Sequence, residues 1–273
     1  MMTGRNRLKA RLKAGETVTA AWFELGSPEV AELLVYSGWD VLVIDCEHGS
    51  AGLEAGLNLL RAVEGAGGEA VIRVPDSSEA TLKRALDRGA RSIMVPMVHT
   101  AKMAREIASF CLYAPRGRRG YAAPIVRATN WGNLPGYAAT AHEELLIMAQ
   151  VEHVETVAEV EEIAGIEGID MAFVGPNDFA ASMNHLEDMD HPDVRAKIEE
   201  VERSATASGL MLGTITGVAG PGRSYSELRD AGYGFIVGPN DVGLLAGAAR
   251  AAKAQAAKEL GEETGEAAPL PSY

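Results

Sequence analysis

The chain has 273 residues, of which 47% are hydrophobic and only 5% aromatic, so it can bury a core of the size that one α/β barrel needs. Its formal net charge of -13, from 38 acidic and 25 basic residues, argues against nucleic acid or an anionic membrane surface as a partner. Cys46 and Cys111 are far apart, and no apolar stretch is long enough for a signal-peptide core or a membrane span. We therefore expect free thiols in a reduced, cytoplasmic setting.

Apolar runs typical of buried strands alternate along the chain with segments of helical periodicity. The first four runs are TVTAAWF (17–23), VLVID (41–45), EAVIRV (69–74) and SIMVPMV (92–98). The next four are LLIMAQVE (145–152), IDMAFVG (169–175), LMLGTI (210–215) and YGFIVG (233–238). Parallel strands buried on both faces are continuously apolar, and eight strand-helix units close the commonest parallel barrel. The pattern therefore predicts an α/β fold, a single (β/α)8 TIM barrel over residues 1–260.

Three segments need separate interpretation. Residues 115–142 are rich in Gly, Pro, Arg and aromatic residues and connect the fourth and fifth strands; a structureless loop of that length is usually functional. The Ala-rich stretch 244–260 is expected to be the eighth helix, packed on the barrel or on another subunit. Residues 261–273 offer little apolar surface to bury, so we expect a disordered tail or an arm that contacts a partner.

Polar residues that close the apolar runs are candidates for chemistry, because barrel enzymes carry their catalytic groups at the carboxyl ends of strands. They are Asp45, Glu47, His48, Arg73, Gln150, Glu152 and Asp178. Glu152 and Asp178 follow neighbouring strands without a histidine or cysteine cluster beside them, and such oxygen ligands suit Mg2+ or Mn2+ better than zinc. Taken alone, Glu152 is equally explained by an ion pair at the rim, and Asp178 by a helix N-cap.

The tetrapeptide GPND occurs twice, at 175–178 and at 238–241, and each copy is typical of a turn that leads into a helix. The motif alone therefore indicates only a helix start. Asp178 is distinguished by Glu152 at the end of the preceding strand, whereas the strand before Asp241 offers only threonines. We predict that Asp178 binds the metal and that Asp241 is a cap.

The carboxyl ends of the predicted strands meet at one end of the barrel, which we call its mouth. Two further features there favour a keto acid as substrate. The backbone from Gly175 through Pro176 to Asp178 lies at a helix start, where amide groups and the helix dipole favour a carboxylate. Arg73, a permanent cation at a strand end, is placed to neutralise the oxyanion of an enolate, with a salt bridge at the rim as the structural alternative.

A possible acid-base pair and the absence of a lysine from the predicted strands indicate which catalytic mechanism to expect. Asp45 precedes His48 by three residues in IDCEH, so its carboxylate can orient the imidazole as a general base, although a lone histidine is more often structural. A covalent aldolase needs a lysine in the barrel for a Schiff base. The lysines, at 9, 13, 83, 102, 197, 253 and 258, fall in predicted helices or terminal segments, which leaves activation by a metal.

Six motifs occur in a characteristic order and spacing: VLVIDCEHG, VIRVP, LDRGARSIMVPMV, RGRRG, QVE and FVGPNDFAASM. Together they resemble the HpcH/HpaI aldolases over about residues 15–250. The resemblance implies a class II pyruvate aldolase on a barrel of the phosphoenolpyruvate/pyruvate superfamily, as in 4-hydroxy-2-oxoheptanedioate aldolase and 2-dehydro-3-deoxyglucarate aldolase. Each motif alone is weak, whereas the set is specific.

Residue by residue, the resemblance implies that Glu152 and Asp178 bind the metal, that Arg73 steadies the enolate, and that His48 with Asp45 serves the acid-base step. The ion would be Mg2+ or Mn2+, with Co2+ as a further option.

The resemblance also implies contacts that spacing alone does not indicate. Gln150 and the turn at Gly175 and Asn177 would bind the carboxylate of pyruvate, and Trp22 would lie near the pocket floor. Asp87 would enter the site of a neighbouring subunit in a hexamer built as a trimer of dimers.

The chain departs from the family pattern at His99, His153 and Asn177, which leaves the aldehyde partner open. The expected reaction is reversible retro-aldol cleavage of a 4-hydroxy-2-keto acid to pyruvate and an aldehyde. Alternatives are a CoA-thioester lyase or a decarboxylase on the same barrel, or a barrel that binds keto acids without catalysis. The first would need a groove for a nucleotide, which the sequence does not show, although the basic GRRG loop at 117–120 could contact a phosphate or a substrate carboxylate.

Overall fold

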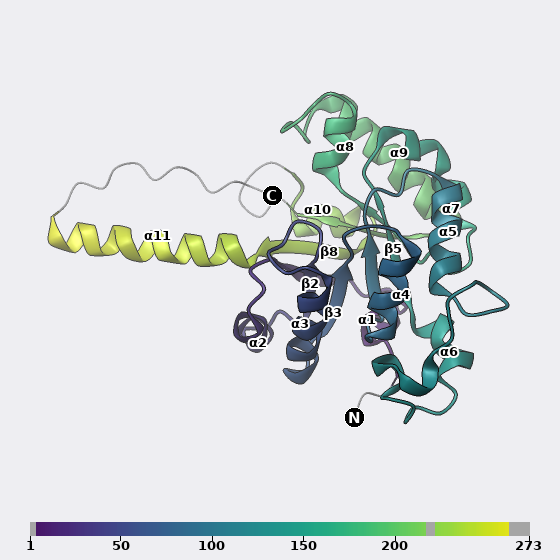
Figure 1. Cartoon of the computed structure of the whole chain (residues 1–273). Coiled ribbons are helices and arrows are strands. Elements are labelled where there is room, and N and C mark those ends of the chain that lie inside the picture. The colour runs from purple at the N-terminus through teal and green to yellow at the C-terminus, as the bar shows by residue number, and fades with distance from the viewer. Residues whose placement is uncertain (1–3, 217–221, 262–273) are drawn as a thin grey trace.

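The computed structural model describes residues 4–216 and 222–261. Within them, eight parallel strands form a closed barrel in chain order, and β8 pairs with β1 (Figure 1). The strands are β1 (Val18–Phe23), β2 (Val41–Asp45), β3 (Glu69–Arg73), β4 (Ser92–Val95), β5 (Leu146–Val151), β6 (Met171–Val174), β7 (Met211–Ile215) and β8 (Tyr233–Asn240). The predicted (β/α)8 barrel is confirmed.

Helices follow most strands and cover the outside of the barrel. They are α1 (Arg7–Lys13), α2 (Pro28–Tyr36), α3 (Leu53–Gly65), α4 (Glu79–Asp87), α5 (Ala101–Cys111), α6 (Tyr137–Glu144), α7 (Val160–Ala164), α8 (Pro176–Ser182), α9 (Pro192–Ser208), α10 (Tyr225–Asp230) and α11 (Asp241–Leu260). Several starts are set by hydroxyl caps: the side chains of Ser27, Ser78, Thr100 and Ser224 each accept a hydrogen bond from a backbone N–H in the first turn.

Alternation along the strands decides which strand-end residues reach the mouth. Val43 packs inside the barrel, whereas Leu42 and Ile44 belong to the layer between the barrel and its helices. Asp45 is in step with Val43, so it points to the barrel axis at the carboxyl end of β2. The same rule places Arg73 at the mouth, two residues after interior Val71.

The connection between β4 and β5 differs from the prediction. Residues 115–142 are not a structureless loop, because they contain the short 3-10 helices η1 (Ala123–Ile125) and η2 (Arg127–Thr129) and the start of α6. The strand itself ends at Val95, earlier than expected, since Pro96 follows and Met97 adopts a left-handed backbone conformation.

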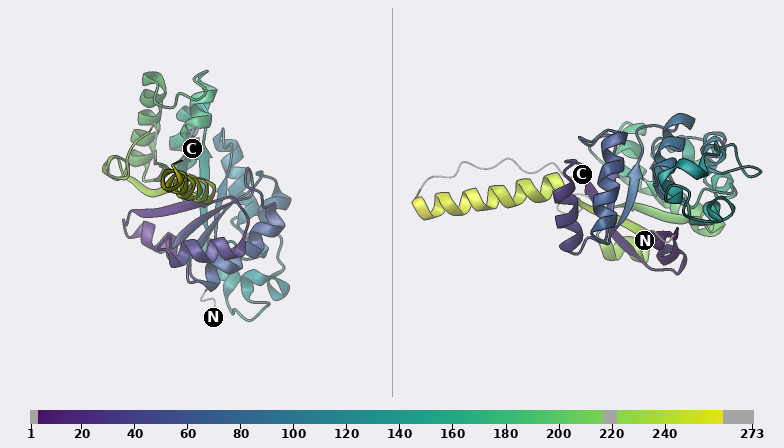
Figure 2. Two further views of the ribbon diagram at one scale, coloured as in Figure 1. Left: turned by 90° about the vertical axis from the view of Figure 1, so that its left-hand side faces the viewer. Right: turned by 60° about the horizontal axis from the view of Figure 1, so that its bottom comes forward.

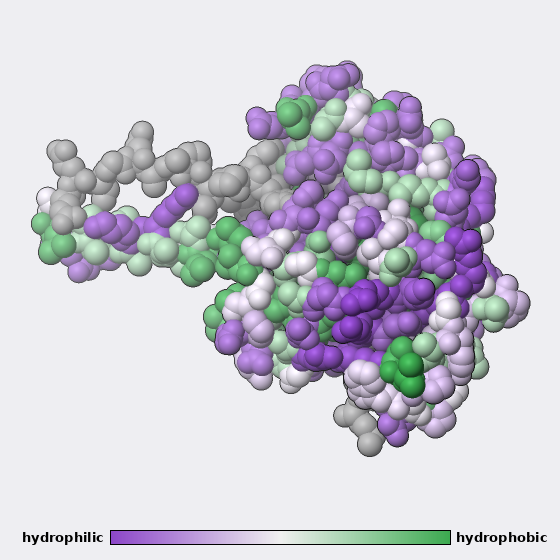
Figure 3. All heavy atoms as spheres, in the orientation of Figure 1, coloured by the Kyte–Doolittle hydropathy of each residue, from purple (hydrophilic) through white to green (hydrophobic). Residues whose placement is uncertain are grey.

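The last helix, α11, extends away from the barrel, as Figure 1 and the right-hand view of Figure 2 show. It begins at Asp241, three residues before the predicted start, and contacts β1 and β8. Leu244 and Leu245 are exposed in the single chain, and Figure 3 shows apolar surface where α11 leaves the barrel. Only Asp241 and Ala257 of this helix are buried in the single chain, and packing on another subunit stays a prediction.

The predicted tail lies outside the described residues from residue 262 onward, and Gly261 is the left-handed C-cap of α11. Among the described residues, no helix combines the length and the apolar character that crossing a membrane requires.

Candidate active site

Glu152 lies directly after β5, and only 4% of it is exposed. One carboxylate oxygen accepts a hydrogen bond from the backbone N–H of Met97 at 3.0 Å, and the other accepts one from the side-chain amide of Gln150. Burial, together with the nearby carboxylates of Asp178 and Glu47, raises the pKa of Glu152 to about 7. The mouth of the barrel therefore holds a carboxyl group that is only partly ionised at neutral pH unless a cation compensates its charge.

Gly175 makes room for this carboxylate. Val151 pairs with Val174 across β5 and β6, so the next residues, Glu152 and Gly175, lie side by side. A Cβ atom at position 175 would lie 2.7 Å from Glu152 Oε1, which no ordinary contact allows. The glycine is therefore required by the close approach of the carboxylate to the backbone, and not by a positive φ angle.

The two GPND segments differ in structure. Gly175 is the N-cap of α8 without a side-chain cap, and the carboxylate of Asp178 forms no hydrogen bond or ion pair with another described residue. In the second copy, the Asn240 side chain caps α11, while the Asp241 carboxylate accepts hydrogen bonds from the N–H groups of Glu24 at 2.9 Å and Leu25 at 3.0 Å. The predicted cap role of Asp241 is wrong, because this residue ties α11 to the end of β1.

The predicted amide cradle is smaller than expected. The N–H of Gly175 donates to the carbonyl of Val151 at 3.2 Å, as part of the barrel ladder, and Pro176 has no N–H. Only the amides of Asn177 and Asp178 remain at this helix start for a substrate carboxylate.

Arg73 is buried and held from three sides. Its Nε donates to one oxygen of Asp45 at 2.9 Å, its Nη2 donates to the other oxygen, and its Nη1 lies 3.4 Å from Glu47 Oε2. The guanidinium also lies over the Trp22 ring, 4.4 Å from the ring centroid. Burial disfavours ionisation of Asp45, but the hydrogen bonds and charge of Arg73 outweigh it and lower the pKa of Asp45.

The predicted pairing of Asp45 with the His48 imidazole is wrong. The Asp45 carboxylate accepts hydrogen bonds from the backbone N–H groups of Glu47 and His48, at 2.9 and 3.1 Å, and its side-chain partner is Arg73. Asp45 and Arg73 are paired in register across β2 and β3, so the arginine occupies the carboxylate. The His48 side chain is 60% exposed, and its acidic neighbour is Glu47, with 3.9 Å between Nε2 and Oε2.

Glu24 is a site residue that the sequence interpretation missed. It follows β1 in step with Ala20 and Trp22, which lie inside the barrel, so strand alternation was the signal that would have identified it. Burial, with the charges of Asp45 and Asp241, raises the pKa of Glu24 to about 7. Its Oε1 is buried without a hydrogen-bond partner among the described residues.

Gln150 and Trp22 are both buried at the site. The Gln150 amide donates to Glu152, which fixes its orientation, and its Oε1 has no partner among the described residues. Trp22 packs edge-on against Phe173, with 6.3 Å between ring centroids, and forms the layer beneath Arg73.

The remaining predicted residues contact other side chains. His99 and His153, two of the departures from the family pattern, stack with 4.8 Å between ring centroids. Asp87 is the last residue of α4, and helices run antiparallel to the strands, so it lies at the end of the barrel opposite the mouth. It forms an ion pair with Arg119 at 2.8 Å, and its predicted entry into a neighbouring site stays a prediction.

Comparison with known proteins identifies the family of the chain. The model of the HpcH/HpaI aldolase/citrate lyase family matches residues 19–246. The chain belongs to the HpcH/HpaI aldolase/citrate lyase family. Members of the family include aldolases similar to this chain, and the protein is accordingly a carbon-carbon lyase.

Two curated relatives and one solved structure define the likeness. Hydroxypyruvate/pyruvate aldolase of Cupriavidus necator is 37% identical over 249 residues, which cover 91% of each chain. 2-Keto-3-deoxy-L-rhamnonate aldolase of Klebsiella pneumoniae is 38% identical over 210 residues, 77% of this chain and 79% of the relative. A family protein of Burkholderia cenocepacia is 36% identical and superposes with a TM-score of 0.85, covering 92% of this chain and 99% of its own.

The raised pKa of Glu152 makes stability depend on pH in protein dialysed against a chelator. Because the pKa in the folded state is about 7, above the ordinary 4.5, the stabilising contribution is fully present below about pH 4.5 and is lost as the pH rises through 7. Between pH 5 and pH 8, we expect wild-type protein to lose on the order of 2 kcal/mol of unfolding free energy relative to Glu152→Gln.

Urea unfolding at each pH measures this difference. Glu155→Gln, which changes a carboxylate that is 79% exposed, is the matched control and should track wild type. A constant difference between wild type and Glu152→Gln over the whole range would contradict the assignment.

Proposed function

We propose that the protein is a divalent-metal-dependent class II aldolase, which reversibly cleaves a 4-hydroxy-2-keto acid to pyruvate, or a pyruvate analogue, and an aldehyde. The observation that carries the proposal is the juxtaposition of buried Glu152 with Asp178, a carboxylate that bonds to no other described side chain or backbone group. The names of the curated relatives support it, because both are aldolases named for 2-keto acids.

The donor set fits a hard divalent cation. Glu152 is oriented by the N–H of Met97 and the amide of Gln150, and each carboxylate oxygen retains a lone pair for a further ligand. Burial and the charge of Asp178 raise the pKa of both Glu47 and Glu152, so ionising these two groups costs free energy that a divalent ion would offset. Such an ion, Mg2+, Mn2+ or Co2+, supplies Lewis-acid stabilisation of the charge that develops on the keto oxygen.

Arg73 is suited to stabilise the same charge. It is fixed by Asp45 and by the Trp22 ring, so it needs no reorganisation when an oxyanion forms. In the cleavage step, a base removes the proton of the 4-hydroxyl group and the bond between C3 and C4 breaks. The electron pair passes to the keto group as an enolate while the aldehyde leaves, and protonation of C3 then gives pyruvate.

We assign the role of the base to His48, and we assign the orientation of its imidazole to a carboxylate other than Asp45. Glu47 takes the place that the sequence assigned to Asp45, because it is the carboxylate near the imidazole. Glu47 also approaches Arg73 Nη1, so one side chain links the base to the cation. Gln150, Asn177 and the Asp178 amide are proposed to bind the carboxylate of the substrate.

The site is proposed to be completed by oligomerisation into a hexamer, with Asp87 supplied by a neighbouring subunit. Support comes from the position of Asp87 away from its own barrel mouth and from the exposed apolar residues of α11. The cytoplasmic setting stays a prediction.

A nucleotide-containing substrate receives no support from the basic loop at 117–120. Arg118 pairs with Glu79 at 3.0 Å and Arg119 pairs with Asp87 at 2.8 Å, so these charges are already engaged within the chain. Neighbouring Arg116 likewise pairs with Glu167.

Pyruvate release tests the function directly. Across a panel of 4-hydroxy-2-keto acids, we expect release with Mg2+, Mn2+ or Co2+, loss with a chelator, and recovery when the metal is restored, because the enolate charge needs the cation. A coupled lactate dehydrogenase assay measures it. No release from any substrate with any of the three metals would overturn the aldolase assignment.

Arg73→Lys is expected to lower kcat by about 10^2 to 10^3, because lysine keeps the charge but cannot hold both oxygens of Asp45 while facing an oxyanion. Steady-state kinetics on the best substrate measure the effect. Arg116→Lys, at an exposed pair, is the matched control and should retain wild-type kcat. Near-normal turnover of Arg73→Ala would refute the role of Arg73.

A further inference from the structure

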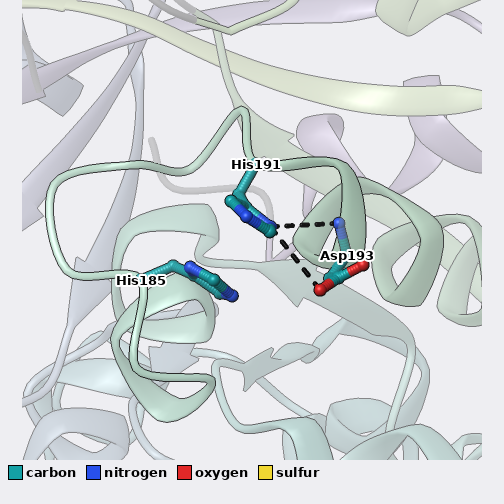
Figure 4. A group of neighbouring side chains, drawn as sticks. All are labelled: His185, His191 and Asp193. Atoms are coloured by element: carbon teal, nitrogen blue, oxygen red, sulfur yellow. Dashed lines mark hydrogen bonds and ion pairs between the residues drawn. The ribbon is translucent and has the colours of Figure 1, made fainter.

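A second group of metal-ligand side chains lies outside the site described above, between α8 and α9. His185 comes from the loop after α8, and His191 and Asp193 come from the start of α9 (Figure 4). One ligand atom from each residue lies within 4.8 Å of the others. The imidazole rings stack with 3.6 Å between centroids and 17° between planes.

The backbone holds the two histidines together. The N–H of His185 donates to the carbonyl of Ala180 at 2.9 Å, which fixes the loop to the end of α8. Two successive turns then connect the histidines: Asp188 N–H donates to the His185 carbonyl at 3.0 Å, and His191 N–H donates to the Asp188 carbonyl at 3.2 Å. The rings are therefore brought together by the fold of the segment before any ligand is considered.

Helix capping explains only part of this group. His191 is the N-cap of α9, and its Nδ1 accepts a hydrogen bond from the Asp193 N–H at 3.2 Å. Capping needs no second imidazole, yet His185 stacks on His191. The His185 ring forms no hydrogen bond or ion pair with the rest of the described chain, so its nitrogens are available to a ligand.

We propose that His185, His191 and Asp193 form a second metal site, which binds a transition ion such as Zn2+, Cu2+ or Ni2+. Two imidazoles and one carboxylate suit these ions, whereas the carboxylate pair at the barrel mouth suits Mg2+ or Mn2+. The two sites therefore differ in ligand chemistry as well as in position.

Binding requires a modest movement of the side chains. Ligand atoms around a tetrahedral zinc ion lie about 3.3 Å apart, since the Zn–N bonds are about 2.0 Å. Starting from 4.8 Å, the two rings must turn out of their parallel stack so that both lone pairs point at one ion. Both histidines are half-exposed and Asp193 is exposed, so this rotation displaces solvent rather than core side chains.

Copper binding to protein saturated with Mg2+ tests the proposal, because the excess Mg2+ occupies the oxygen site. We expect one equivalent of Cu2+ to bind with electron paramagnetic resonance couplings from two nitrogens. His185→Asn should remove one nitrogen coupling and weaken Cu2+ binding at least 10-fold, and Asp193→Asn should weaken it less. His142→Asn is the matched control, because His142 is also a half-buried histidine beside a carboxylate, with 3.7 Å between its Nε2 and Glu143 Oε1.

A wild-type spectrum without two nitrogen couplings, or unchanged Cu2+ binding in His185→Asn, would overturn the proposal. Loss of binding in His142→Asn would do the same. Pyruvate release with Mg2+ should be unaffected by His185→Asn, and the copper spectrum does not depend on activity. Failure of this site and failure of the aldolase assignment are therefore distinguishable.

Discussion

The burial of the Glu152 carboxylate beside Asp178 is the constraint on which the active site depends. A carboxylate that leaves water must be compensated, by hydrogen bonds, by a cation or by a proton. Met97 and Gln150 supply hydrogen bonds, and Gly175 keeps its side-chain space clear for the Oε1 atom. These contacts fix the position of the charge without cancelling it.

The balance of charge at the mouth of the barrel favours a bound cation. Arg73 is the cation nearest to the acidic residues, but its guanidinium is engaged by both oxygens of Asp45. Glu47 lies 3.4 Å from Arg73 Nη1, whereas Glu152 and Asp178 form no ion pair with another described residue. A divalent ion would compensate this excess of negative charge and at the same time provide the electrophile that an enolate requires.

Much of the fold and part of the site could be predicted because they depend on local pattern. Continuous apolar runs indicate buried parallel strands, and the carboxyl ends of such strands identify Arg73 and Glu152 without a structure. Which side chain each carboxylate binds could not be predicted in this way. Asp45 is three residues from His48 in sequence, yet its cross-strand register with Arg73 decides which side chain it binds. The spacing of residues along the sequence does not show whether Asp45 binds His48 or Arg73.

One other error has the same origin. The amide of Gly175 was unavailable because the barrel ladder uses it, which depends on strand register. The helix α11 contacts β1 and β8 and leaves Leu244 and Leu245 exposed, so its packing on another subunit stays a prediction. Glu24 differs, because the alternation of β1 already placed it inside the mouth.

Deuterium exchange into the methyl group of pyruvate tests the central claim most directly, since it requires enolate formation but no aldehyde. Proton NMR in D2O should show exchange accelerated by wild-type enzyme with Mg2+ or Mn2+, and return to the uncatalysed rate with a chelator or with Glu152→Gln. Glu155→Gln should exchange like wild type. Exchange that persists unchanged in the chelated enzyme or in Glu152→Gln would contradict a metal-stabilised enolate at Glu152 and Asp178.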